Sequence, residues 1–118
     1  MSPKRGDRAT PPARPDEYDL RFANNETVKG WDELCRQAPG NIRTAFDAIR
    51  ANPCPAPSNK RQHRLKHELA WGIHNGKILQ QWQYEVTGGG RIWYLIDDDT
   101  RTVWLVYAGT GHPKTTDP

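Results

Sequence analysis

The sequence predicts an α+β fold: a small antiparallel sheet of about four strands with a two-helix hairpin packed on one face. Three observations predict it. An alternating apolar and polar segment lies near residue 20, two amphipathic helical segments follow, and three β-rich segments come in a row after residue 77. The chain has 118 residues and a hydrophobic content of only 35%, which suffices for one compact domain.

We expect residues 1–17 to form a disordered, basic, proline-rich tail and residues 18–116 to form the domain. The tail contains four prolines and four basic residues and no apolar stretch, which favours disorder and argues against a signal peptide. It is then either a solvated extension or an electrostatic arm that touches nucleic acid. No run in the sequence approaches the roughly 20 apolar residues of a membrane span, so the expected location is the cytoplasm.

The first half of the domain is expected to hold a strand and two helices. Residues 18–22 alternate apolar and polar side chains, as a half-buried strand does. Asn24 or Asn25 can cap a helix in which apolar residues share one face: Val28, Trp31, Leu34 and Cys35. A Pro-Gly pair at 39–40 ends this helix. The next helix repeats the spacing with Ile42, Ala45, Phe46 and Ile49, and it ends before Pro53.

Three strands are predicted in the second half, at Leu79–Val86, Arg91–Ile96 and Thr102–Ala108. A glycine run at 88–90 and an acidic turn at 97–100 separate them. Alternation places the apolar residues on one, buried face: Trp82, Tyr84, Val86, Ile92, Tyr94, Ile96, Val103, Leu105 and Tyr107. The open face then carries a different set: Gln81, Gln83, Glu85, Arg91, Trp93 and Trp104.

This open face is the first candidate binding surface. Trp93 and Trp104 there can stack on nucleic-acid bases, each stack contributing about 1–3 kcal/mol. The alternative is that both tryptophans pack under the neighbouring basic loop or against a partner chain. Arg91 suits phosphate binding because a guanidinium stays charged and binds two oxygens at once, whereas the alternative for Arg91 is a surface ion pair with Glu85.

The segment 60–69 is the most basic stretch of the chain. Its cations are candidates for sequence-independent phosphate contacts, or else form an ordinary solvated charge run: Lys60, Arg61, Arg64 and Lys66. His63 and His67 are four residues apart but lack a third ligand, and the two cysteines do not form a zinc pattern. We therefore expect no metal and no cofactor.

The order of elements resembles the RelE/ParE superfamily of bacterial toxins. Four segments are similar to family patterns: Ile49–Pro53, Arg64–Leu69, Gly90–Asp97 and Val103–Lys114. The resemblance covers about Tyr18 to Thr116. It implies a RelE-like toxin of a type II toxin–antitoxin system, an endoribonuclease that cleaves mRNA, usually on the ribosome, and that an antitoxin neutralises.

The resemblance leaves two other functions open. Members of the ParE branch inhibit DNA gyrase, and an inactive relative would only bind its antitoxin. The sequence departs from the nuclease branch in two ways: it lacks a tyrosine near the C-terminus, and His67 stands where the family usually has glycine.

Metal-free RNA cleavage uses the 2′-hydroxyl as the nucleophile, and it needs a proton acceptor, a proton donor and cations for the phosphate charge. The catalytic candidates are Arg91 for the phosphate, His112 as acid or base, and Lys114 as a further phosphate contact. The alternative for His112 and Lys114 is a solvated tail. For the expected antitoxin, apolar and aromatic residues on so small a domain are the docking surface.

Overall fold

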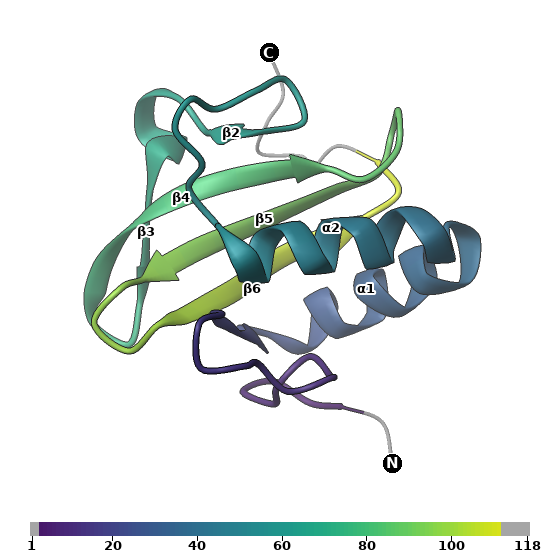
Figure 1. Ribbon diagram of the computed structural model, residues 1–118, viewed down its shortest axis with the longest axis horizontal. Coiled ribbons are helices and arrows are strands. Elements are labelled where there is room, and N and C mark those ends of the chain that lie inside the picture. The colour runs from purple at the N-terminus through teal and green to yellow at the C-terminus, as the bar shows by residue number, and fades with distance from the viewer. Residues whose placement is uncertain (1–2, 112–118) are drawn as a thin grey trace.

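The computed structural model describes residues 3–111, in which two helices lie across one face of a sheet (Figure 1). The helices are α1 (Asn25–Gln37) and α2 (Pro39–Ala51), each of 13 residues, and a short 3-10 helix is η1 (His67–Ala70). The strands are β1 (Asp19–Phe22), β2 (Gln62–Arg64), β3 (Trp71–His74), β4 (Lys77–Glu85), β5 (Arg91–Asp97) and β6 (Thr102–Gly109). None of the described helices is long and apolar enough to cross a membrane.

The described strands form one six-stranded sheet in the order β1-β6-β5-β4-β2, with β3 pairing with the other half of β4. The α+β class and the helix hairpin are confirmed. The expected sheet of about four antiparallel strands is corrected, because β1 runs parallel to β6 and the basic stretch contributes β2. In the β1–β6 pair, Asp19 is aligned with Thr102, far along the chain. Alternation within a segment does not reveal which distant segment it pairs with.

The core lies between the sheet and the two helices. Tyr94 is completely buried there, and Leu34 of α1 and Ile49 of α2 are buried against the same cluster. The Trp31 ring meets Phe22 and Phe46 edge-on, with ring centres 5.9 and 6.1 Å away. The apolar faces predicted for both helices therefore form the cover that the sheet needs.

A β-bulge in β6 changes one predicted position. Trp93 pairs with Tyr107, whereas its neighbour Tyr94 pairs with Leu105, so β6 contains one extra residue at Val106. Alternation therefore reverses beyond Leu105. Tyr107, which was expected in the core, projects from the opposite face, and Ala108 takes the buried position instead.

The N-terminal segment that was expected to be a solvated tail contacts the sheet in its described part. The backbone amides of Gly6 and Ala9 each donate a hydrogen bond of 2.7 Å to β1, and Ala9 is buried. Glu17 forms an ion pair of 3.1 Å with the buried Arg50 of α2. These hydrogen bonds pair the backbone groups on the edge of β1 that β6 leaves open. Amino-acid composition does not show that these groups need a partner.

Gly30 allows α1 to lie directly on β6. A Cβ added at Gly30 would overlap the backbone carbonyl of Ala108, whereas a Cβ added at Gly40 of α2 would meet nothing within 4 Å. Glycine at position 30 is therefore a packing requirement, since only glycine fits this approach.

We predict that Gly30→Ala lowers the free energy of unfolding by about 1–3 kcal/mol, because α1 must move away from β6. The matched control Gly40→Ala is expected to be neutral or stabilising by up to about 1 kcal/mol, since alanine favours helix. Urea denaturation of both variants measures this. Equal stability of the two would show that the contact between α1 and β6 is not tight.

Candidate nucleic-acid interface

The sheet face that points away from the helices carries a row of side chains across four strands. Strand register aligns His63 of β2 with Gln83, Gln83 with Trp93, and Trp93 with Tyr107. Residues aligned in this way project from the same face of a sheet. The two ends of the row, His63 and Tyr107, are three strand spacings apart, roughly 14 Å.

The next row, toward the ends of β4 and β6, holds the charged residues. Arg91 is aligned with Glu85 and with Gly109, and Arg91 Nη1 lies 3.5 Å from Glu85 Oε2. Arg61 extends this row, because its carbonyl oxygen accepts a 2.7 Å hydrogen bond from the Glu85 amide. Its guanidinium also donates to the Glu85 carbonyl oxygen at 3.1 Å. The ion pair between Arg91 and Glu85 that the sequence left as an alternative is present.

Arg91 is held in a largely enclosed position. Its side chain is 10% exposed, whereas that of Glu85 is 35% exposed. The guanidinium is therefore enclosed, while the carboxylate beside it is partly exposed. The position at the start of β5 is the one predicted for a phosphate-binding arginine.

Tyr107 is the residue of this face that sequence alternation missed. Its ring centre lies 6.1 Å from that of Trp93, and its hydroxyl donates a 2.7 Å hydrogen bond to the carbonyl oxygen of Gly111. Burial raises the pKa of Tyr107, the nearby Arg91 acts in the opposite direction, and Glu33 of α1 raises it further. The available sequence signal was Gly109, since a glycine within a strand often marks a bulge or a close approach.

Trp93 is buried and does not offer a stacking surface. It is 4% exposed, and its Nε1 donates a 2.8 Å hydrogen bond to Gln83 Oε1. Trp104 is half-buried, with its ring 4.1 Å from the ring of His74. The prediction that both tryptophans stack on bases is thus wrong for Trp93, and His74 covers one side of Trp104. The alternative, packing under the basic loop or a partner chain, stays untested: the contacts of Trp93 are with Gln83 and Tyr107 in the sheet, and that of Trp104 is with His74 of β3.

The covering segment is the stretch from β2 to β3. Gln81 Nε2 donates to the Leu69 carbonyl oxygen at 2.8 Å, and Gly72 rests against the buried Leu95 side chain. These two contacts hold η1 and β3 over the middle of the sheet face that points away from the helices. Within residues 3–111, the end that carries Arg91, Glu85 and Tyr107 lies outside these two contacts.

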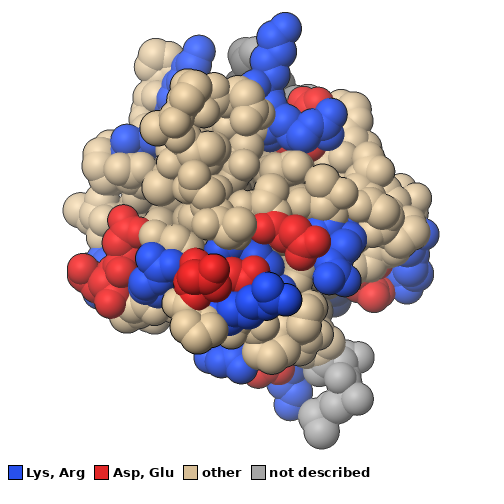
Figure 2. Space-filling model, viewed as in Figure 1, with Lys and Arg blue, Asp and Glu red and all other residues tan. Residues whose placement is uncertain are grey.

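The cations of segment 60–66 divide into two groups. Arg64 is engaged within the fold, because its Nε and Nη2 each donate to the Ala70 carbonyl oxygen at 3.2 Å and its guanidinium lies 4.3 Å from the Trp71 ring centre. Lys60 and Lys66 are exposed around an open hollow that His63 also lines. Figure 2 shows Lys and Arg side chains gathered at the end of the molecule where Figure 1 places β2.

The two remaining predicted site residues, His112 and Lys114, lie outside the described residues. The last described residue is Gly111, whose carbonyl oxygen receives the hydrogen bond from Tyr107. Across residues 3–111, no three His, Cys, Asp or Glu residues lie close enough together to hold a metal ion.

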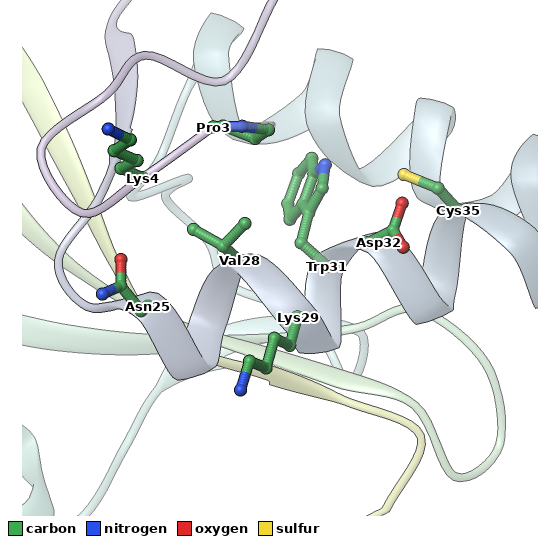
Figure 3. Close-up of a pocket in the computed structure, with 8 residues that line it drawn as sticks. All are labelled: Pro3, Lys4, Asn25, Val28, Lys29, Trp31, Asp32 and Cys35. Carbon is green, nitrogen blue, oxygen red and sulfur yellow. The ribbon is translucent and has the colours of Figure 1, made fainter. Parts of the chain in front are cut away.

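A second hollow lies on the helix side, away from this interface (Figure 3). The N-terminal segment forms one wall with Pro3 and Lys4, and α1 forms the other. Its α1 wall combines apolar and charged side chains: Val28, Lys29, Trp31, Asp32 and Cys35. No residue of the charged row lines this hollow, so it is a separate feature of the surface.

Comparisons with known proteins bear on the fold. No protein-family model matches the chain, and no curated protein matches it. Among solved structures, it is similar to a chain of the toxin–antitoxin complex RelBE2 from Mycobacterium tuberculosis. The match has a TM-score of 0.56 and 21% sequence identity, and it covers 80% of this chain and 98% of that chain. The chain therefore has the RelE-like fold that its order of elements predicted.

Proposed function

We propose that this chain is the toxin of a type II toxin–antitoxin system and an endoribonuclease that acts on ribosome-bound mRNA. The observation that carries the proposal is the group formed by Arg91, Glu85 and Tyr107 at one end of the sheet. It combines a cation, a carboxylate and a hydroxyl beside exposed lysines. Similarity to a chain of a toxin–antitoxin complex supports the toxin assignment.

The proposed reaction is attack of a ribose 2′-oxygen on the adjacent phosphorus. The 2′-hydroxyl proton passes to a carboxylate, the bond between phosphorus and the 5′-oxygen breaks, and the leaving oxygen receives a proton. The products are a 2′,3′-cyclic phosphate and a 5′-hydroxyl end. Each proton needs a positioned group, and the charge on the phosphate needs a fixed cation.

Arg91 is the proposed cation. Its pairing with Glu85 orients the guanidinium before RNA arrives, and the strand backbone on both sides fixes its position. A phosphate would displace the carboxylate and bind Arg91 Nη1 in its place. Glu85, once displaced, accepts the 2′-hydroxyl proton, a role for which His112 is the alternative that the sequence predicts.

Tyr107 is the proposed proton donor. Burial keeps its pKa above the ordinary value, so its hydroxyl carries a proton at neutral pH. It lies one strand from Arg91, close enough that the guanidinium affects its pKa. Tyr107 thus supplies the tyrosine that was missing from the end of the sequence.

The partners of this function are mRNA on the ribosome and an antitoxin protein. Arg61 of the charged row is exposed, and Lys60 and Lys66 are exposed around the neighbouring hollow; all three are proposed to contact flanking phosphates. We propose that the antitoxin is encoded next to this chain and binds it directly. Co-purification with the neighbouring gene product tests the antitoxin separately from cleavage.

We predict that Arg91→Ala reduces the rate of RNA cleavage by about 10²–10³-fold, the usual effect of removing one preorganised charge donor. The control is Arg43→Ala, because Arg43 forms only an exposed ion pair with Asp47 on α2 and its loss changes net charge equally. The assay follows a labelled RNA and identifies the cyclic phosphate end. Growth arrest with intact mRNA and stalled gyrase would instead indicate the ParE-like function.

Tyr107→Phe is predicted to lower the cleavage rate by about 10²–10⁴-fold while leaving the fold unchanged, since the ring contact with Trp93 remains. Because burial raises the pKa of Tyr107, the wild-type rate should persist through neutral pH and fall only at strongly alkaline pH, where the hydroxyl loses its proton. Tyr107→Phe should lack this alkaline fall. An unchanged rate in this variant would exclude Tyr107 as the donor.

Replacing Lys60 and Lys66 together by alanine is predicted to weaken RNA binding equally for different sequences. The slope of log affinity against log salt should decrease by about 1.4, or about 0.7 for each lost phosphate contact to single-stranded RNA. Lys29→Ala on α1 is the control, since Lys29 is exposed on the helix side. Fluorescence anisotropy at several salt concentrations gives the slope. An unchanged slope would show that RNA does not pass this end of the sheet.

A further inference from the structure

The hairpin of β3 and β4 exposes an apolar surface that the proposed chemistry does not use. The three exposed large hydrophobic residues found in the described chain all lie on it: Trp71 at 52%, Ile73 at 74% and Ile78 at 69%. Ile73 and Ile78 are directly paired across the hairpin, and Trp71 is two residues from Ile73, so the three share one face. We call this set the hairpin patch. A contiguous exposed apolar patch on a small domain indicates an interaction surface.

The strand beside the patch has an open edge. In the described part of the chain β3 pairs only with β4, and its sequence, Trp-Gly-Ile-His, contains no lysine or proline. Edge strands usually carry such residues because they prevent pairing with other chains. Both the apolar face and the edge therefore remain available at the same place.

Charges of both signs surround the hairpin patch. Asp98 and Asp99 line the same hollow as Trp71 and Ile78; the Asp99 side chain is 88% exposed, and its Oδ2 lies 3.8 Å from Nζ of Lys77. On another side, the Arg64 guanidinium lies 4.3 Å from the Trp71 ring centre. In Figure 2 the surface at the β3 and β4 end of the molecule is largely tan, with acidic atoms bordering it.

We propose that the hairpin patch is a self-association surface that binds a second copy of this chain around a two-fold axis. In such a contact, residues near the axis meet the same residues of the other copy. Ile73 and Ile78 are apolar, so they can meet their counterparts without charge repulsion. Residues away from the axis meet different residues, so the acidic rim of one copy faces the basic rim of the other. A rim of a single sign would repel itself.

The proposed dimer leaves the charged row open. Arg91 begins β5, and Asp97, which lines the hollow beside the patch, ends it, so the two regions are separated by the length of a seven-residue strand, roughly 20 Å. Association and cleavage are therefore separable by mutation. With three apolar anchors in each copy, the contact belongs to the small, concentration-dependent class of interfaces.

The proposal is tested by measuring the average mass of the full chain by sedimentation equilibrium, over a range of concentration of about 100-fold. The wild-type average mass should rise toward that of a dimer. Ile73→Lys should remain monomeric at every concentration, because two ammonium groups would meet at the axis, whereas Gln37→Lys, an equal charge change on exposed α1, should dimerise as wild type does. Asp99→Lys should shift the transition to higher concentration.

Three results would overturn the proposal: a wild-type protein that stays monomeric throughout, an Ile73→Lys variant that dimerises normally, or an Ile73→Lys variant that instead loses binding of the neighbouring gene product. The last would identify the antitoxin as the occupant of the patch. Circular dichroism verifies that Ile73→Lys is folded. RNA cleavage by Ile73→Lys should equal that of wild type, so failure here is distinct from failure of the proposed function.

Discussion

The register shift in β6 is the constraint on which both sides of the sheet depend. One extra residue at Val106 turns Tyr107 away from the helices and brings Ala108 toward them. On the helix side, the small Ala108 and the absent side chain of Gly30 let α1 approach the β6 backbone closely. On the other side, Tyr107 comes to lie near Arg91. A single bulge thus links the tightest helix packing in the described fold to the composition of the candidate site.

Polar side chains on the other face serve mainly to hold its cover. Gln83 binds the Trp93 indole, Gln81 binds the Leu69 carbonyl oxygen, and Arg64 binds the Ala70 carbonyl oxygen. Each interaction satisfies a polar group that burial would otherwise leave without a hydrogen bond. In the described residues, the covering segment therefore leaves the candidate site at one end of the sheet, where Glu85 and Tyr107 are partly exposed and Arg91 is enclosed beside them.

Periodicity was sufficient to predict the helices, the last three strands and most of the core, because these depend on local spacing and burial. It failed at Tyr107, since a bulge reverses alternation without leaving a repeat in the sequence. It also could not predict that residues 6–9 pair with β1, because that contact depends on β6 taking only one edge of β1 and leaving the other unpaired. In the candidate site, Arg91 and its pairing with Glu85 were predictable from facing positions across a hairpin, whereas the burial of Trp93 required knowledge of the covering segment.

The enclosed ion pair keeps a cation in a fixed position, which is what the proposed reaction requires. An exposed arginine is mobile and pays an entropic cost on binding phosphate, while Arg91 is already held by Glu85 and by strands on both sides. In the proposed reaction, an incoming phosphate would replace the Glu85 carboxylate beside Arg91, so one anion would be exchanged for another. The same exchange would free the Glu85 carboxylate to accept a proton. Under the proposed function, positioning the cation and supplying the base would then be two consequences of the same pair.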